Sequence, residues 1–239
     1  MSVPNDPLAR LEQMAKRQSA EEKAEKAIRI ARGKFLRGKD ASAAFFATLS
    51  LQLKLAANWE CKTAATDGKR LVYDPDWVNS LSPPQRVGLC AHEVLHCAND
   101  HIGRRVGREH KRWNIACDAA INPPLREAGC ELPPGGVFPG EGEYRNLPVG
   151  LSAEEYYPLI PKQAGDSGEG DGCGQDPGGS GGVMDSGDQA EAAVTKAEWQ
   201  VALAQAVSVA KQRGQLPAGL ARMVEEIQDA VEEALLGSR

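Results

Sequence analysis

Residues 82–98, SPPQRVGLCAHEVLHCA, contain the pattern that decides the fold, the pentapeptide HEVLH at His92–His96. Apolar residues recur at helical spacing through this stretch, and Ser82 followed by Pro83-Pro84 is a typical helix start. On a helix, residues four apart lie about 40° apart round the axis, so both imidazoles can reach one metal ion. Glu93 lies at the flank, where it can deprotonate a metal-activated water. The stretch therefore predicts a zinc-binding helix with Glu93 as general base.

The length and composition limit the number of domains and the kinds of partner that we expect. A length of 239 residues favours one domain, or one domain with helical extensions. The net charge of -5 gives no reason to expect nucleic-acid binding or a membrane surface. No apolar run resembles a signal peptide or a membrane span, so we expect a cytoplasmic protein. Six cysteines without a CxxC pair are expected to be reduced thiols, mostly in the core.

The order of patterns along the chain predicts an α+β fold dominated by helices. Residues 1–39 are expected to form a charged helical extension, and residues 40–163 the core. Residues 164–189 are rich in Gly, Asp and Ser, which is typical of a flexible loop. Residues 190–239 return to helical patterns and are expected to pack on the core.

Within the core, residues 40–58 read as one buried helix. Residues 62–73 then predict a β-hairpin around an Asp-Gly turn at positions 67 and 68. We expect its second strand, Arg70–Tyr73, to pair with an extended substrate. A further helix is expected from about residue 111 to 128, bent or split by Pro123-Pro124.

The third metal ligand is best sought on that second helix. Asp118 lies in a mostly apolar stretch, where an unpaired carboxylate would be costly to bury. Asn114, Asp118 and Asn122 are spaced by four residues and form one polar strip, which a metal with its histidines would partner. Asp100, four residues after His96, and the two asparagines are candidates for hydrogen bonding to the ligands.

His101 is a weaker candidate ligand. On a continuous helix it lies about 180° from His92, and the intervening CAND sequence contains neither Gly nor Pro to turn the chain. His110 follows a basic loop, which favours a surface histidine.

Three segments together resemble a known family: TAATDGKRLVYDPDWV, HEVLHCANDH and WNIACDAAIN. They are similar to the "putative metallopeptidase domain" of bacteria and phages, often found upstream of a von Willebrand factor A-like domain, and the likeness covers roughly residues 40–230. The resemblance implies a zincin-like fold, zinc on His92, His96 and Asp118, and Glu93 as general base. The chain departs from this pattern at its C-terminus, because it stops at Arg239 without room for an A-like domain. A protein partner supplied in trans is therefore an expectation that does not specify the partner's class.

The leading functional hypothesis is a zinc metallopeptidase acting on a peptide or protein substrate. The oxyanion donor stays open among Tyr144, Tyr156, Tyr157 and His101. The main alternative is a zinc-stabilised binding or assembly module without catalysis, which a fourth protein ligand from His101, Cys97 or Cys117 would favour. A non-proteolytic zinc hydrolase would use the same residues.

Overall fold

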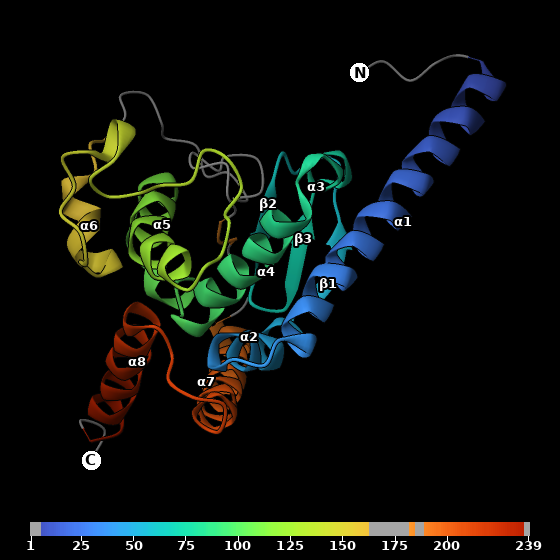
Figure 1. Cartoon of the computed structure of the whole chain (residues 1–239). Helices are drawn as coiled ribbons and strands as arrows, with labels where there is room; N and C mark the ends of the chain where they lie inside the picture. Colours follow the sequence, from blue (N-terminus) through green and yellow to red (C-terminus); the bar gives the residue numbers. More distant parts are fainter. Residues whose placement is uncertain (1–5, 163–181, 185–188, 237–239) are drawn as a thin grey trace.

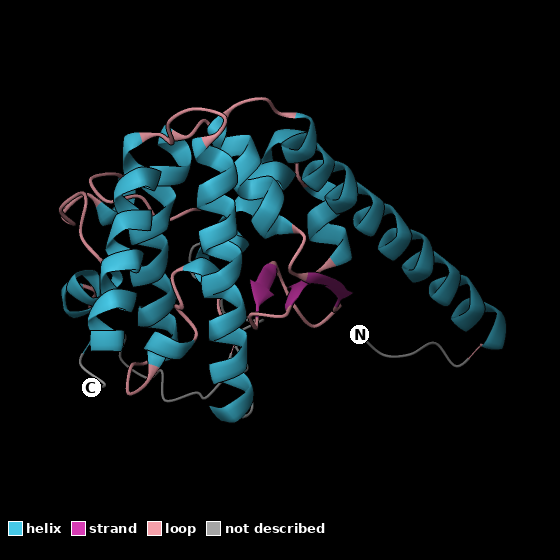
Figure 2. Cartoon of the chain, turned by 90° about the horizontal axis from the view of Figure 1, so that it is seen from below, coloured by secondary structure: helices cyan, strands magenta, loops and turns pink. Residues whose placement is uncertain are grey.

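The computed structural model of the chain describes residues 6–162, 182–184 and 189–236 (Figure 1). Its helices and strands, in chain order, are α1 (Pro7–Arg37), α2 (Ala41–Ser50), β1 (Lys54–Ala57), β2 (Ala64–Thr66), β3 (Arg70–Tyr73), α3 (Pro75–Ser80), α4 (Pro83–Ala98), α5 (His110–Glu127), α6 (Ala153–Leu159), α7 (Gln189–Lys211) and α8 (Ala218–Leu236), with short 3-10 turns at Gly103–Arg105 and Gly142–Tyr144. The fold is α+β and dominated by helices, as the sequence predicts. Figure 2 shows the packed helices with the small sheet to one side.

The sheet has the strand order β1-β3-β2. The expected hairpin around Asp67-Gly68 is confirmed: β2 pairs with β3 antiparallel, and Gly68 has a φ of 87° that glycine adopts without strain. β1 pairs with β3 in parallel on the other side. Because β3 is bonded on both edges, the expectation that Arg70–Tyr73 pairs with a substrate is wrong, and β2 is the edge strand facing α4.

Two other expectations about the core need correction. Residues 40–58 are not one helix, since α2 ends at Ser50 and residues 54–57 form β1. The parallel partner that converts this apolar stretch into a strand lies 16 residues further on, beyond any local pattern. Of the bend or split expected in α5, the split is absent, because the helix continues through Pro123 and Pro124.

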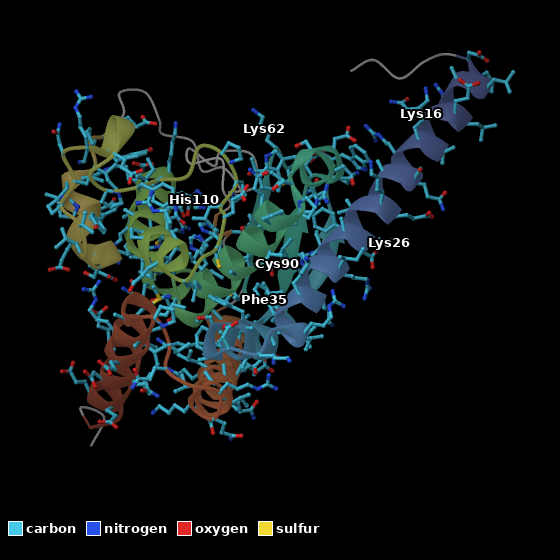
Figure 3. The ribbon with its side chains drawn as sticks, in the orientation of Figure 1. Lys16, Lys26, Phe35, Lys62, Cys90 and His110 are labelled. Carbon is cyan, nitrogen blue, oxygen red and sulfur yellow. The ribbon has the colours of Figure 1, made fainter. Side chains whose placement is uncertain are left out.

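The main hydrophobic core joins helices that are far apart in sequence. It includes Ala24, Ile28 and Phe35 of α1, the phenylalanines of α2, the inner face of α4, and residues of α7 and α8. Phe35 and Cys90 lie within this region, while Lys16 and Lys26 of α1 are exposed (Figure 3). A second cluster surrounds α5 and α6 and contains Trp113, Cys117, Tyr156 and Val183. Helices α4 and α5 meet between the two clusters (Figure 1).

The cysteines do not all stay reduced. Cys90, Cys97, Cys117 and Cys130 are free thiols, but Cys61 is disulfide-bonded, so the expectation of reduced thiols is wrong for this residue. In the part of the chain that the structure describes, no helix combines the length and apolar character that crossing a membrane would require.

Candidate metal centre

Helix α4 carries the HEVLH pentapeptide into the interior. Ser82 caps the helix in a capping box with Gln85, and Pro83 begins the first turn, as the sequence predicts. From Gly88 to Ala98 every residue is buried. His92, Glu93 and His96 are each 0% exposed, so the helix is covered on its polar side as well as on its apolar stripe.

Helix α5 supplies the polar side that faces these histidines. Its residues Asn114, Asp118 and Asn122, each at most 1% exposed, follow one another at intervals of four and share one face. A buried strip of this kind requires hydrogen-bond or metal partners, because each polar group has lost its water. Each of the three residues contacts at least one residue outside α5.

Three side-chain atoms from the two helices converge. His92 Nε2 and His96 Nε2 are 2.9 Å apart. Asp118 Oδ1 lies 3.5 Å from His92 Nε2 and 3.2 Å from His96 Nε2. In tetrahedral zinc sites with bonds of about 2.0–2.1 Å, neighbouring ligand atoms lie about 3.3 Å apart. The spacing and the chemistry of this donor set therefore fit one zinc ion.

The orientation of His92 is fixed by a hydrogen bond at Nδ1, the ring nitrogen that does not face Asp118. Asn122 Nδ2 donates to the carbonyl of Val137 at 3.0 Å, which leaves its Oδ1 to face His92 Nδ1 at 2.9 Å. An amide oxygen only accepts, so His92 carries its proton on Nδ1 and presents the Nε2 lone pair to Asp118. Asn122 thus contacts His92, one of the two histidines of the pentapeptide.

His96 is oriented by His101. The prediction that His101 lies on the opposite side of a continuous helix from His92 is wrong. Helix α4 ends at Ala98, and Asp100 has a left-handed φ of 51°, which turns the chain back. Asp tolerates this conformation better than most residues, so the turn needs neither Gly nor Pro. His101 is buried with its Nδ1 3.0 Å from His96 Nδ1, and its carbonyl accepts from Trp113 Nε1 at 2.7 Å.

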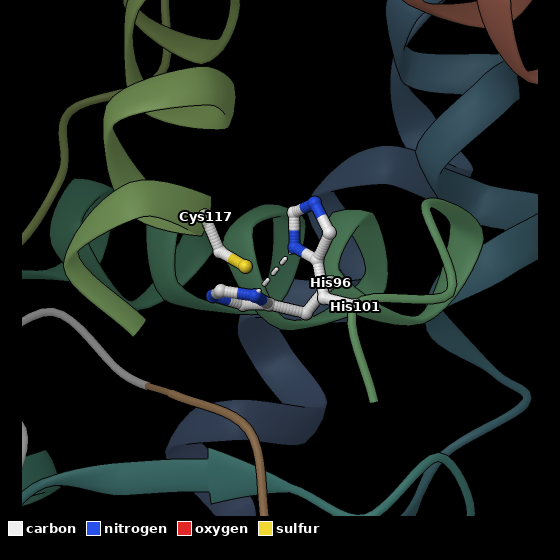
Figure 4. A group of neighbouring side chains, drawn as sticks. All are labelled: His96, His101 and Cys117. Carbon is white, nitrogen blue, oxygen red and sulfur yellow. Dashed lines mark hydrogen bonds between the residues drawn. The ribbon is translucent and has the colours of Figure 1, made fainter. Parts of the chain in front are cut away.

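A second group of possible ligands surrounds this contact. His96, His101 and Cys117 have ligand atoms within 4.8 Å of one another, and Cys117 projects from α5 towards the two rings (Figure 4). One arrangement satisfies both groups: if His96 uses Nε2 for a metal, its Nδ1 keeps a proton and donates it to His101. Among the described residues, the group around Asp118 has three members.

Two other candidate residues lie elsewhere. Asp100 forms an ion pair with Lys196 at 2.8 Å and accepts from the Gly103 amide. It does not meet either imidazole, because the left-handed turn carries it away and the ring nitrogens bond other partners. Asn114 Oδ1 instead faces the Val183 amide at 3.5 Å.

Glu93 lies on the face of α4 that looks towards the sheet. Residues 90, 93 and 97 share that face at intervals of three and four. Cys97 Sγ lies 3.3 Å from Thr66 Oγ1 on β2, and the charge of Glu93 adds to burial in raising the pKa of the Cys97 thiol. Glu93 therefore lies on the same face of α4 as Cys97, which contacts strand β2.

Burial keeps the two histidines neutral. It lowers the pKa of His92 to about 4, although the Asp118 charge acts in the opposite direction. It lowers the pKa of His96 to about 3. Neutral imidazoles have a free lone pair at physiological pH, which is the form that binds metal.

A cavity of about 560 Å³ opens on the far side of His101, between α5, α7 and α8. His101, Trp199 and Met223 are among its lining residues, whereas the residues that carry the three converging atoms are not.

Two histidines and an aspartate brought to one point by two helices define an α+β protein with a potential metal centre. The chain belongs to the family described as "Putative metallopeptidase domain", whose model matches residues 19–233. Neither the curated proteins nor the solved structures with which the chain was compared match it.

Proposed function

We propose that the chain is a zinc-dependent peptidase with zinc held by His92, His96 and Asp118, in a zincin-like arrangement. The observation that carries the proposal is the convergence of two imidazole Nε2 atoms and one carboxylate oxygen within 3.5 Å of one another. Membership of a metallopeptidase family supports the reaction class. A peptide or protein is then the substrate.

In this proposal a bound zinc ion supplies a Lewis acid and lowers the pKa of a water towards about 7. Glu93 accepts the proton of the attacking water and delivers it to the leaving amine. Asn122 and His101 hold the two imidazoles in the required tautomers. Tyr156 is a poor oxyanion donor, because its hydroxyl already donates to the Pro148 carbonyl at 2.7 Å.

Burial favours a second candidate function, a zinc-stabilised binding module without catalysis. The three proposed ligand residues are at most 1% exposed, as in a structural site. The three-membered donor group argues for the peptidase, because a closed structural site needs a fourth protein ligand.

The test compares wild type with Glu93→Gln and Glu93→Asp on a peptide library, with metal content measured for each. Glu93→Gln should retain about one zinc per chain and lose hydrolysis by at least about 10²-fold. Glu93→Asp keeps a carboxylate and should retain more activity than Glu93→Gln. Normal cleavage by Glu93→Gln would remove Glu93 as the base, and absence of cleavage by zinc-loaded wild type would favour the binding module.

A further inference from the structure

A short piece of the chain, residues 182–184, forms an isolated β-bridge with the edge strand β2. Thr66 donates its amide to the Gly182 carbonyl at 2.8 Å, and the Met184 amide donates to the Thr66 carbonyl at 2.8 Å. Thr66 and Val183 form a parallel bridge. Residues 182–184 are thus held by the backbone contacts that an edge strand offers to any extended peptide.

Helix α5 binds the other side of this segment. His110 Nε2 donates to the Val183 carbonyl at 2.6 Å, so this histidine is not the free surface residue expected from the sequence. Asn114 Oδ1 faces the Val183 amide at 3.5 Å. We call the space between the β2 edge and the His110–Asn114 face of α5 the strand groove.

The strand groove leads to the metal centre. His110, Asn114 and Asp118 follow at intervals of four on α5, which places each about 6 Å along the helix from the last. The backbone of Val183 therefore lies about one helical turn from the proposed ligand Asp118. On the opposite side, Thr66 contacts Cys97, one turn from Glu93 on α4.

The groove selects side chains as well as backbone. Val183 is 0% exposed and belongs to the hydrophobic cluster of Trp113, Ala116 and Cys117. At Gly182, an added Cβ would lie 2.9 Å from Asn114 Nδ2. An occupant thus fits best with a small residue followed by a branched apolar residue.

We propose that the strand groove is the binding site for extended peptides with a small residue followed by a branched apolar residue, and that Gly182–Met184 occupies it as an internal competitor. Its role as the substrate site rests on the proposed peptidase function, whereas binding itself requires no catalysis. A tethered competitor has a high local concentration, so an external peptide binds weakly until the segment is displaced.

The experiment uses a labelled, end-blocked peptide with the sequence of residues 181–186, GGVMDS, and full-length Glu93→Gln protein that cannot cleave it. Val183→Asp in that background places a charge in an apolar cluster and should expel the segment. We expect the peptide to bind at least 10-fold more tightly to this variant than to its parent. The same change at Val106, which is 85% exposed, is the matched control and should have no effect. A GGDMDS peptide should not bind.

If Val183→Asp fails to fold, hydrogen exchange can be measured instead on the Glu93→Gln protein without further changes. Saturating GGVMDS should leave the Thr66 amide protected and remove protection from the Met184 amide. Unchanged Met184 protection, or equal peptide affinity with and without Val183→Asp in a folded chain, would overturn the proposal. If wild type binds the peptide but does not hydrolyse it, only the peptidase function is contradicted. If wild type hydrolyses peptides without binding them in the strand groove, only this inference is contradicted.

Discussion

His96 is the residue on which both buried polar groups depend, because its two ring nitrogens face different partners. Nε2 faces His92 and Asp118, and Nδ1 faces His101. A proton on Nδ1 is needed for Nε2 to accept a metal, and His101 is the acceptor that holds it there. His101 therefore acts on the metal through His96.

This contact predicts a graded effect on zinc affinity, measured by competition with a chelator. His101→Ala should weaken zinc binding by about 10- to 100-fold, as is usual when a ligand loses its orienting partner. His101→Asn can still accept from His96 Nδ1 and should recover part of that loss. Asp118→Ala removes a ligand and should have the largest effect. Equal affinities for wild type and His101→Ala would show that the contact has no role in binding.

The buried histidines also predict how the metal-free protein responds to acid. Their pKa values are lowered by burial from 6.5 to about 4 and about 3. The unfolded chain therefore takes up protons below about pH 6.5 before the folded chain does. The free energy of unfolding therefore keeps its full value above that pH and falls as the pH drops towards 4. At pH 5 the loss is about 2 kcal/mol per histidine.

Urea unfolding in the presence of chelator at pH 7 and pH 5 measures this loss. His92→Gln should remove about a third of the pH dependence, because burial lowers the pKa of His101 as well as those of His92 and His96. A free energy of unfolding that stays constant between pH 7 and pH 5 would contradict the assignment of neutral buried histidines.

At the scale of elements, α4 is positioned by close approach to the loop after α5. A Cβ added at Gly88 would lie 2.1 Å from the Glu131 carbonyl oxygen and 2.8 Å from its carbon. Both atoms belong to the backbone, which cannot move aside as a flexible side chain would. The glycine thus permits the packing that places His92 and His96 opposite α5.

Gly88→Ala should lower the free energy of unfolding by about 1–3 kcal/mol through overpacking. Gly33→Ala on α1 is the matched control, because the nearest atoms, in the Arg37 guanidinium, are 3.5 Å away. There alanine should stabilise the helix by up to about 1 kcal/mol. Denaturant melts of both variants check the difference, and a similar shift in both would count against the close approach.

Many helix starts and turns could be predicted from local sequence patterns. Ser82, Pro83 and Gln85 mark the start of α4, and Asp67-Gly68 marks the hairpin, because caps and turns depend on neighbouring residues. The strand β1 was not predictable, since its strand partner in the described part of the chain is β3, 16 residues further on. The turn at Asp100 was missed as well, although Asn99-Asp100 is a pair that tolerates a helix end.

At the scale of the whole molecule, the proposed metal joins α4, which packs in the main cluster, to α5, which contributes to both clusters. His92 and His96 come from α4 in the main cluster, and Asp118 comes from α5 beside the second cluster. The polar strip on α5 predicted that a buried partner exists. The strip could not predict the burial of the whole centre or the β-bridge formed by Val183, because both depend on segments distant in sequence.

A metal that bridges two helices should stabilise the entire fold. Zinc at about 1,000 times its Kd should add about 4 kcal/mol, which corresponds to a Tm increase of about 10 °C for a chain of this size. Asp118→Ala should lose most of this increase while Val106→Asp retains it. Calorimetry with and without zinc checks the prediction, and an equal Tm increase in Asp118→Ala would place the metal elsewhere.

The most direct test of the central claim is X-ray absorption at the zinc edge of the loaded protein. If zinc lies on His92, His96 and Asp118, the spectrum should contain only nitrogen and oxygen neighbours at about 2.0–2.2 Å, including two imidazoles. A sulfur neighbour at about 2.3 Å would show that the metal is bound by Cys117 with His96 and His101, and would contradict the proposed centre.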